Sequence, residues 1–255
     1  MQYIQSYYTD IGIKRKSNQD SLALLKADTE YGEVLLAVLC DGMGGYQFGE
    51  LASKVCVKEF ARWFKNKFAV LLYSGMDFEK IKEDWKRMIE KCNNMLVDYG
   101  QEHGINMGST LTAFLFVEKR YYAVQIGDSR GYVIADSVKQ ITRDHSLVAS
   151  EIEKGIISKE AAKTDNRTNI LIECIGVTRS VNMDFYTGEV HSKDSFLLCS
   201  DGLWHKIEDE ELKRYLSGSN MNDNKQMRMH LNFLVETVKG RGERDNISAI
   251  GIVPI

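Results

Sequence analysis

The sequence has almost no proline and no long hydrophobic run. Its single proline, Pro254, is near the end of the chain, so no proline-rich linker separates domains. Turns must therefore depend on the 20 glycines and on Asn and Asp. The longest apolar run, Val34 to Cys40, has seven residues, whereas roughly 20 are needed to cross a bilayer. The first ten residues also lack the basic and apolar regions of a secretory signal. We therefore expect no membrane insertion and no export.

Cysteine and histidine do not occur in metal-binding or disulfide patterns. The cysteines are odd in number, form no C-x-x-C pair and lie mostly within apolar runs: Cys40, Cys56, Cys92, Cys174 and Cys199. This usage is typical of buried thiols in a reducing compartment, so we expect a cytoplasmic protein. None of the five histidines has H-E-x-x-H or similar spacing, which disfavours zinc.

The charge distribution disfavours nucleic acid as a partner. The net charge is −3, and the 33 Lys and Arg residues are scattered along the chain rather than massed. A chain of 255 residues can bury roughly three quarters of its extended surface, enough for one large core. We expect a single domain over residues 1–255 and a monomer.

Hydrophobic patterning predicts an α+β fold. Runs rich in Val, Ile, Tyr and Phe predict strands at residues 2–8, 33–40, 109–117, 121–126, 131–135, 181–190, 195–199 and 246–253. Apolar residues at three- and four-residue spacing predict helices at 49–68, 78–99, 146–163, 207–216 and 225–239. Because the strands come in hairpin-like groups rather than alternating with helices, we expect antiparallel sheets with helices packed outside.

Aspartates recur at the boundaries of these apolar runs. The five are Asp20, Asp41, Asp128, Asp201 and Asp245. Strand ends that pack side by side would bring such carboxylates together, and they repel one another unless a cation neutralises them. Oxygen ligands of this kind suit Mg²⁺ or Mn²⁺. The sequence therefore predicts a divalent metal site at one end of the sheets.

Two of these aspartates precede glycine. Asp-Gly is also a common turn pair, so one instance is weak evidence; two copies at the ends of apolar runs, Asp41-Gly42 and Asp201-Gly202, are stronger. We expect Gly42 to let the backbone turn sharply and to offer its carbonyl to a metal held by Asp41.

Other glycine-containing motifs fit less well. Gly127 to Gly131 matches G-x-S-x-G, but that motif leads into a helix, whereas a strand is expected here, so Ser129 is interpreted as a hairpin residue. The stretch from Gly42 to Gly49 resembles a nucleotide-binding loop, yet Gln47 replaces its third glycine and no G-K-[ST] follows.

The order of the motifs resembles that of the metal-dependent PP2C-type (PPM) serine/threonine protein phosphatases, in their compact bacterial form. The matching segments span most of the chain: Arg15-Lys16-Ser17-Asn18-Gln19-Asp20, Asp41-Gly42-Met43-Gly44-Gly45, Gly108-Ser109-Thr110, Gly127-Asp128-Ser129-Arg130, Thr142-Arg143-Asp144-His145-Ser146, Ser200-Asp201-Gly202-Leu203-Trp204 and Asp245-Asn246. The resemblance implies a four-layer αββα sandwich with a cleft at one end.

The resemblance also implies a metal ligand set. Asp41 would bridge two Mn²⁺ or Mg²⁺ ions, and Gly42 would supply its carbonyl to one of them. Asp201 and Asp245 would bind the other ion, and Asp20 would hold a metal-bound water. The water shared by the ions would attack phosphorus in line, without a covalent enzyme intermediate.

Further roles follow from the same resemblance. Asp128, with Asp201, would bind a third, weaker metal. Arg15 would clamp the substrate phosphate, for which its planar fork is suited. Residues 147–175 would form a mobile flap beside the cleft. The implied partners are phosphorylated proteins and a bacterial Ser/Thr kinase with its targets.

Two positions depart from the family pattern. Met43 stands where many members have a histidine proposed to protonate the leaving group, which leaves the general acid unassigned. Gln19 stands where many have Glu, which removes a charge near one metal. An active phosphatase is expected, but two alternatives stay open: a catalytically silent, metal-bound module that binds phosphoproteins, and a two-metal nuclease, for which the sequence offers no basic groove.

Overall fold

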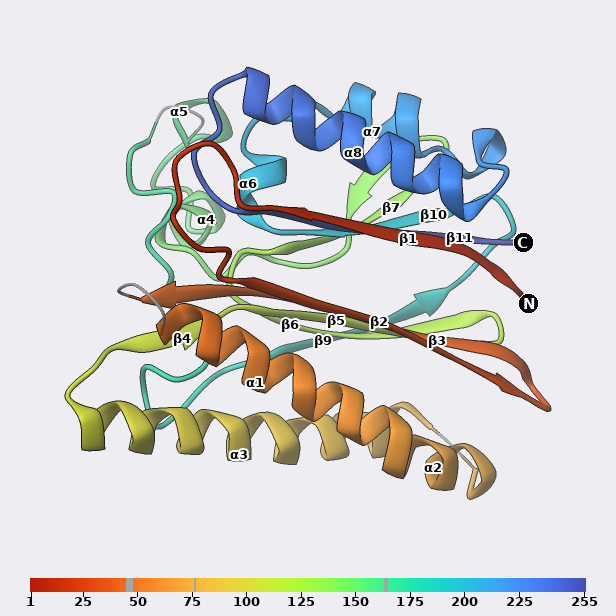
Figure 1. The fold of residues 1–255 in the computed structure, drawn as a ribbon, viewed down its shortest axis with the longest axis horizontal. Helices are drawn as coiled ribbons and strands as arrows, with labels where there is room; N and C mark the ends of the chain where they lie inside the picture. The colour runs from red at the N-terminus through yellow and green to blue at the C-terminus, as the bar shows by residue number, and fades with distance from the viewer. Residues whose placement is uncertain (45–47, 76, 163–164) are drawn as a thin grey trace.

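The chain folds into two face-to-face β-sheets covered on both outer faces by helices, as Figure 1 shows. The structure is a computed structural model that describes residues 1–44, 48–75, 77–162 and 165–255. The four-layer αββα arrangement confirms the expected fold class. Both termini lie at one end of the sandwich, on the right of Figure 1, and the loops that carry the candidate site lie at the other.

The first sheet has the strand order β2-β3-β5-β6-β9, and β4 pairs with the end of β3. All neighbouring strands in it are antiparallel. Its strands are β2 (Asp20–Thr29), β3 (Gly32–Gly44), β4 (Met107–Ser109), β5 (Leu111–Val117), β6 (Arg120–Ile126) and β9 (Asp184–Glu189). Three helical elements cover its outer face: α1 (Phe48–Trp63), α2 (Ala69–Tyr73) and α3 (Phe78–His103).

The second sheet has the order β1-β11-β10-β7-β8 and is also antiparallel. Its strands are β1 (Tyr3–Asp10), β7 (Arg130–Ile134), β8 (Val138–Gln140), β10 (Ser195–Cys199) and β11 (Ile247–Pro254). Its outer face is covered by α6 (Asp201–Trp204), α7 (Asp209–Leu216) and α8 (Asn224–Gly240). Two short helices, α4 (Leu147–Glu153) and α5 (Lys159–Ala162), lie at the site end.

Strand β3 shows why an uninterrupted apolar run forms a strand here. Residues 34–40 are all fully buried, because helices cover one face of the sheet and the second sheet covers the other. Val34, Leu36 and Val38 pack in the cluster under the helices, whereas the alternate residues Leu35 and Ala37 pack between the sheets. The period of two expected for a strand is therefore satisfied on both faces.

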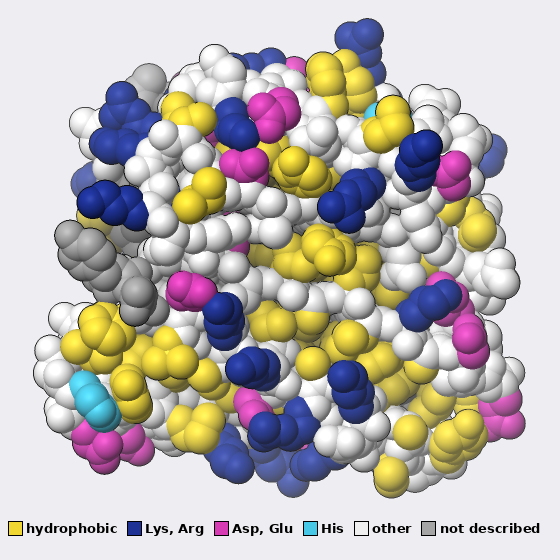
Figure 2. All heavy atoms as spheres, in the orientation of Figure 1, with side chains coloured by type: hydrophobic (Ala, Val, Ile, Leu, Met, Phe, Trp, Pro, Cys, Tyr) yellow, Lys and Arg dark blue, Asp and Glu magenta, His cyan; other side chains and the backbone are white. Residues whose placement is uncertain are grey.

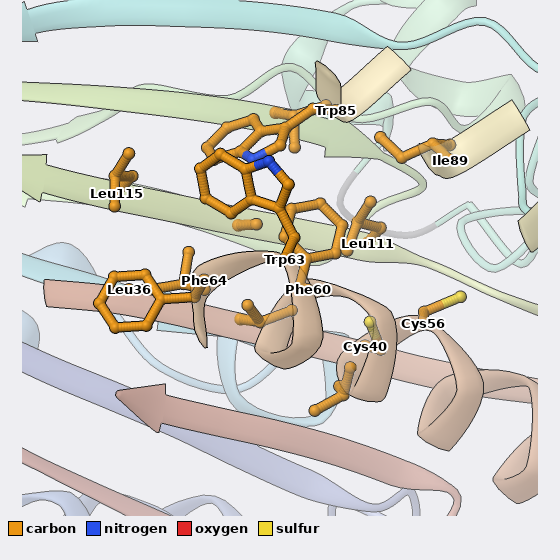
Figure 3. Packing of buried hydrophobic residues seen from close by; sticks show 14 of the residues in the cluster. Leu36, Cys40, Cys56, Phe60, Trp63, Phe64, Trp85, Ile89, Leu111 and Leu115 are labelled. Atoms are coloured by element: carbon orange, nitrogen blue, oxygen red, sulfur yellow. The ribbon is translucent and has the colours of Figure 1, made fainter. Parts of the chain in front are cut away.

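Aromatic side chains join the outer helices to the first sheet. Trp85 on α3 packs against Phe60 and Trp63 on α1, with ring centroids 5.5 Å apart in both pairs. Figure 3 shows these three rings close together, with Leu115 of β5 on one side of them and Leu111 on the other. The contact explains the long amphipathic pattern of α3, whose apolar stripe covers α1 and the sheet.

Most expected elements are present, but some were missed, among them strands β2 and β8, and two predicted helices are wrong in extent. Strand β2 was not expected, and the helix expected at 146–163 is two short helices separated at Gly155, whose left-handed φ of 69° ends the first. The helix expected at 49–68 leaves the α conformation after Trp63 and continues as a π-turn over Phe64–Phe68. Gly45 and Gln47 lie outside the described residues. Among the described residues, none of the helices combines the length and apolar character needed to cross a bilayer.

Candidate metal and phosphate site

The structure brings the five aspartates to one end of the sandwich. Asp20 is the first residue of β2 and lies directly opposite Asp41 of β3 in the strand register. The other three lie in the β6–β7 turn, at the first position of α6 and just before β11, and are Asp128, Asp201 and Asp245. Segments that are more than 200 residues apart in sequence thus meet at the strand ends.

The backbone of Asp41 is held by β4 and the residue after it. The Asp41 N–H donates to Thr110 Oγ1 (2.8 Å), and the Thr110 N–H donates to the Asp41 carbonyl (2.9 Å). Ser109 Oγ also donates to that carbonyl (3.1 Å). The Gly-Ser-Thr motif therefore fixes the position of the central carboxylate, a role that the sequence did not reveal.

Gly42 does not make the expected sharp turn, because it continues β3 opposite Ser109. A side chain is excluded there for a different reason. A Cβ on Gly42 would lie 2.2 Å from the Gly49 carbonyl oxygen and 2.6 Å from that of Gln19. The glycine is needed because the start of α1 packs directly against the strand backbone beside Asp41.

Asp20 and Asp245 are connected through Asn246. The Gln19 N–H donates to Asn246 Oδ1 (2.9 Å), and Asn246 Nδ2 donates to the carbonyls of Ile11 (2.9 Å) and Ser17 (3.1 Å). Asn246 thus fastens the loop between β1 and β2 to the start of β11. Asn246 belongs to the Asp245-Asn246 motif, but the sequence alone predicts no role for it.

Arg15 lies in that fastened loop and forms an ion pair with Asp245. Its side chain is 49% exposed, so the guanidinium is at the mouth of the site rather than inside it. The hydrogen bond to Asp245 raises the pKa of Arg15, and the charges of Asp41 and Asp201 add to the effect. Arg15 therefore lies beside the cluster of aspartates. Its ion-pair partner, Asp245, is itself a candidate metal ligand.

Asp128 is positioned by the α6 helix. Trp204 Nε1 donates to the Asp128 carbonyl (3.0 Å), and the Trp204 ring stacks on the Arg130 guanidinium at 3.4 Å. Arg130 in turn donates through Nη2 to Asp144 (2.7 Å). Because Trp204 and Asp201 belong to the same short helix, the hydrogen bond from Trp204 to the Asp128 carbonyl fixes the position of Asp128 relative to Asp201.

The same turn contains Ser129, which is a hairpin residue as expected. It leads into strand β7, and no helix follows. Its hydroxyl is fully buried and lies 2.8 Å from Thr110 Oγ1. Ser129 is therefore part of the scaffold that holds Asp41 and not a nucleophile.

The carboxylates raise one another's pKa. Burial raises the pKa of Asp20 to about 7, and burial with the nearby charge of Asp245 raises that of Asp201 to about 7. Burial and then the charges of Asp20 and Asp201 raise the pKa of Asp41 well above its ordinary value. Burial and the Asp201 charge do the same for Asp128. Such mutual repulsion is expected where a cation is the natural counter-charge.

At the site, two buried carboxylate oxygens have no hydrogen-bond partner among the residues that the structure describes, Oδ1 of Asp20 and Oδ1 of Asp201. The other oxygen of Asp20 accepts from Ser200 Oγ (2.9 Å). A hard divalent cation fits these orphaned oxygens, because Mg²⁺ and Mn²⁺ prefer carboxylate and carbonyl oxygen. Within the described residues, no three Asp, Glu, His or Cys side chains form a metal-holding group by themselves. Water and backbone oxygens such as the Gly42 carbonyl would have to complete the coordination.

The two positions that depart from the family pattern have structural roles. Met43 continues β3 opposite Gly108 of β4, with its side chain partly buried. Gln19 Nε2 donates to the Gly44 carbonyl (3.3 Å), which ties the loop before β2 to the end of β3. Neither residue supplies an acidic proton to the site.

The segment 147–175, apart from its two undescribed residues 163 and 164, is tied to β4 at its end. The Leu147 N–H donates to the Ile170 carbonyl within the segment (2.8 Å), and Ile175 exchanges two backbone hydrogen bonds with Ser109. Arg167 also forms an ion pair with Glu151 on α4. The end of the segment at Ile175 therefore lies beside β4, which pairs with the strand end that carries Asp41.

Comparison with known proteins identifies the family. A family model described as protein phosphatase 2C matches residues 13–242. The serine/threonine phosphatase stp of Listeria innocua is 31% identical over 247 residues, which cover 96% of this chain and 93% of that protein.

Solved structures that resemble this chain are also serine/threonine phosphatases. The serine/threonine phosphatase Stp1 from Staphylococcus aureus superposes with a TM-score of 0.86 at 30% identity, covering 100% of this chain and 96% of that one. The catalytic domain of the serine threonine protein phosphatase PstP, in complex with two manganese ions, superposes with a TM-score of 0.77 at 27% identity and covers 99% of both chains. The chain belongs to the protein phosphatase 2C family and is a protein phosphatase.

Proposed function

We propose that this protein hydrolyses phosphoserine and phosphothreonine in proteins with a pair of Mn²⁺ or Mg²⁺ ions and a third, weaker ion. The observation that carries the proposal is the group of five aspartates beside Arg15, two of which have buried oxygens without a partner. The names of the relatives, and the manganese bound to PstP, support the same substrate class and metal.

In this proposal each aspartate has one task toward the ions. Asp41 and the Gly42 carbonyl would hold the pair of ions. Asp201 and Asp245 would hold one ion, and Asp20 would orient water at the site. When bound, the ions lower the pKa of water and neutralise charge on the phosphoryl oxygens.

The third ion would depend on a different pair of residues. Asp128 and Asp201 would hold it together. The hydrogen bond from Trp204 to the Asp128 carbonyl connects Asp128 to α6, the helix that contains Asp201.

The chain's own residues bind the phosphate and exclude a covalent route. Arg15, at the exposed mouth, can present two N–H groups to phosphoryl oxygens and stabilise their charge. Ser129 is buried and hydrogen-bonded, so it is not available to take the phosphoryl group. Water is then the acceptor, and the products are inorganic phosphate and the free hydroxyl amino acid.

The proposed physiological role is to oppose a bacterial Ser/Thr kinase in the cytoplasm. Supporting this, the matched relatives are bacterial phosphatases, and the sequence carries no massed basic surface that would direct the enzyme to nucleic acid. We propose that the chain acts as a single catalytic domain and as a monomer.

The test is hydrolysis of p-nitrophenyl phosphate and of a phosphothreonine peptide with Mn²⁺, with EDTA, and in Asp41→Asn. We expect EDTA to abolish both activities and added Mn²⁺ to restore them. Asp41→Asn should lower kcat/KM by at least about 100-fold, the upper range for losing even an indirect metal contact.

A matched control keeps this test specific. Asp28→Asn removes an aspartate from the same β2–β3 hairpin, far from the site and near the turn, and should leave both rates unchanged. A rate that resists EDTA, or Asp41→Asn at full activity, would contradict the metal mechanism. No activity on either substrate would favour the silent phosphoprotein-binding module instead.

A further inference from the structure

His145 is a buried histidine in the motif at residues 142–146. It is 5% exposed, and on the face drawn in Figure 2 histidine side chains cover only small areas. A buried imidazole needs partners for both of its ring nitrogens. The Gly127 N–H donates to Nδ1 (3.4 Å), and Nε2 lies 3.0 Å from Asp184 Oδ2. One of the two partners is thus the residue before Asp128, a candidate ligand of the third ion.

The hydrogen-bond geometry assigns the proton on the His145 ring. The Gly127 N–H points at Nδ1, which must therefore be an acceptor. The proton is then on Nε2, which donates to Asp184 Oδ2. That oxygen also accepts from the Tyr186 hydroxyl (3.3 Å), so the carboxylate is itself held in place. Asp184 therefore selects the tautomer in which His145 accepts a bond from the turn.

His145 holds the start of the turn that carries Asp128. Its own N–H donates to the Gly127 carbonyl (2.8 Å), so His145 bonds to both backbone groups of that glycine. Gly127 has a left-handed φ of 93°, and a Cβ there would lie 2.5 Å from Thr110 Cγ2. The glycine is therefore enclosed between His145 and Thr110, and Thr110 is also the residue that bonds to the Asp41 backbone.

The rest of the motif pairs with the same turn. Asp144 forms an ion pair with Arg130 (2.7 Å), and Thr142 Oγ1 accepts from the Gly131 N–H (2.9 Å). The motif and the turn therefore run past each other in opposite directions. In this pairing His145 lies at the end next to the candidate ligand of the third ion.

The main chain of His145 connects the turn to the segment 147–175. The His145 carbonyl accepts from the Ile172 N–H (2.9 Å), and the Leu147 N–H donates to the Ile170 carbonyl (2.8 Å). Residues 170–172 thus pair with His145 and the residues after it. A displacement of this part of the segment would act on His145, and through its side chain on the turn.

We propose that His145 is a positioning residue for the third ion and that it couples this ion to the segment 147–175. Through Nδ1 it holds the Gly127 backbone, and so the direction in which Asp128 leaves the turn. Because its carbonyl bonds to the segment, ion binding and docking of the segment favour each other by the same factor. The inference rests on the third ion of the proposed function and adds a residue that acts on it indirectly.

Two substitutions separate the two ring nitrogens. His145→Asn can place an amide oxygen where Nδ1 lies but does not reach Asp184, whereas His145→Gln can place an amide nitrogen near Nε2 but has no acceptor at Nδ1. We expect His145→Gln to weaken the third ion about tenfold, the lower end for losing an indirect metal contact, and His145→Asn to weaken it less than about twofold. Mn²⁺ titration followed by electron paramagnetic resonance counts the ions, and the first two should bind as in the wild type.

His230 supplies the matched control, because its Nδ1 lies 2.6 Å from the Tyr215 carbonyl and contacts α7 rather than the turn. His230→Gln should leave all three ions unchanged. Three ions bound by His145→Gln as in the wild type, or all three weakened alike, would overturn the role of His145 alone. A wild-type protein that binds two ions and no third would overturn the third ion as well, while p-nitrophenyl phosphate hydrolysis reports separately on the phosphatase function.

A measurement on the wild type does not depend on how the variants fold. Long-range ¹⁵N–¹H correlation in histidine-labelled protein distinguishes a protonated ring nitrogen from a bare one, and the His145 signals are those missing in His145→Asn. We expect a proton on Nε2 and none on Nδ1. A proton on Nδ1 would overturn the assignment, because the Gly127 N–H would then face another donor.

Hydrogen exchange tests the coupling to the segment. The Ile172 N–H should exchange about tenfold more slowly when Mn²⁺ fills the third site than when only the first two ions are bound, because the coupling is reciprocal. His145→Gln should lose this difference, and His145→Asn should keep it. Mass spectrometry of peptides covering residues 165–175 measures the rate, with α8 as the reference that should not change. Equal exchange at both Mn²⁺ levels in the wild type would overturn the coupling.

Discussion

The two ends of strand β3 meet opposite physical demands. Residues 34–40 are apolar, fully buried and packed on both faces, so this part of the strand stabilises the fold by itself. The next residue, Asp41, lies near the carboxylates of Asp20, Asp128 and Asp201, and burial raises the pKa values of all four groups. One strand thus joins a region that is complete without a ligand to a region whose charge needs a cation.

The comparison shows where stability and function are separated in this molecule. The aromatic contact of Trp85 with α1 lies in the apolar region, whereas the orphaned oxygens of Asp20 and Asp201 lie in the charged one. Buried charges without partners destabilise a fold. The apolar region must therefore offset a cost at the site, which protonation of the carboxylates or, in the proposed function, a bound cation would relieve.

The largest expected effect comes from comparing one substitution in the apolar region with one among the site carboxylates. Trp85→Ala should lower the free energy of unfolding by about 3–5 kcal/mol, because it removes a fully buried ring. Asp41→Asn should raise the melting temperature of the metal-free protein, because it removes one of five repelling charges. Urea and thermal unfolding in EDTA measure both.

The two variants also differ with metal present. Trp85→Ala should keep its stabilisation by Mn²⁺ and its activity below its melting temperature, whereas Asp41→Asn should lose both. If Asp41→Asn destabilised the metal-free protein as much as Trp85→Ala does, the contrast between the two ends of β3 would be wrong.

The second prediction concerns pH. The pKa values of Asp20 and Asp201 are raised from 3.8 to about 7 in the folded protein, so the fold binds protons more tightly than the unfolded chain. Stability from these groups is present below about pH 4 and is lost as the pH rises through 7. Metal-free protein should therefore melt at a lower temperature at pH 8 than at pH 5.

Mn²⁺ should reverse this dependence, because cations bind ionised carboxylates. Differential scanning calorimetry at pH 5–8, with Mn²⁺ or EDTA, measures both slopes. The double variant Asp20→Asn/Asp201→Asn is the control and should flatten the slope in EDTA. An unchanged slope in the double variant would show that other groups cause the pH dependence.

The third prediction is smaller and concerns Arg15, which pairs with Asp245. In the proposed site, a metal ion and the guanidinium would compete for the Asp245 carboxylate. Arg15→Met should tighten Mn²⁺ binding about two- to fivefold, the range for losing an exposed ion pair. It should also raise the KM for a phosphothreonine peptide about tenfold, because a charged hydrogen-bond donor to phosphate is lost.

Isothermal titration with Mn²⁺ measures the metal affinity of Arg15→Met, and phosphothreonine-peptide kinetics measure its KM, so the two effects are determined separately. Lys16→Met removes the neighbouring positive charge and is the control, with neither change expected. Weaker Mn²⁺ binding in Arg15→Met would mean that Arg15 supports the metal site rather than competing with it.

The smallest expected effect tests the link between α6 and Asp128. Trp204→Phe keeps an aromatic ring on Arg130 but loses the hydrogen bond from Nε1 to the Asp128 carbonyl. The loss of about 1 kcal/mol of hydrogen bonding should weaken the third ion about fivefold and leave the first two unchanged. Mn²⁺ titration followed by electron paramagnetic resonance counts the ions, and weakening of all three would refute the separate role.

Sequence patterning predicted most of the fold because its strands are buried on at least one face. Strand β2 is the instructive failure. It is a half-exposed edge strand rich in Leu, Ala and Lys, residues that favour helices, and it becomes a strand only through its ladder with β3. Gly155 could have shown the break between α4 and α5, since glycine commonly ends a helix.

The site was predicted in part, for a physical reason. Asp20, Asp41, Asp128, Asp201 and Asp245 stand at the boundaries of apolar runs, so the sequence alone indicated that the strand ends would bring them together. The partners that hold them were not visible. Ser109 and Thr110 bond to Asp41, and Ser200 to Asp20, across 68 or more residues of sequence.

The order of residues by itself determined the fold class, the acidic character of the site and the family, because each depends on local patterning or on short motifs. Tertiary structure alone decided that Gly42 is required by close packing, that Arg15 pairs with Asp245 and that Asn93 ties Gly176 to α3. These features depend on atoms that approach within a few ångströms from distant parts of the chain, and no local pattern records such distances.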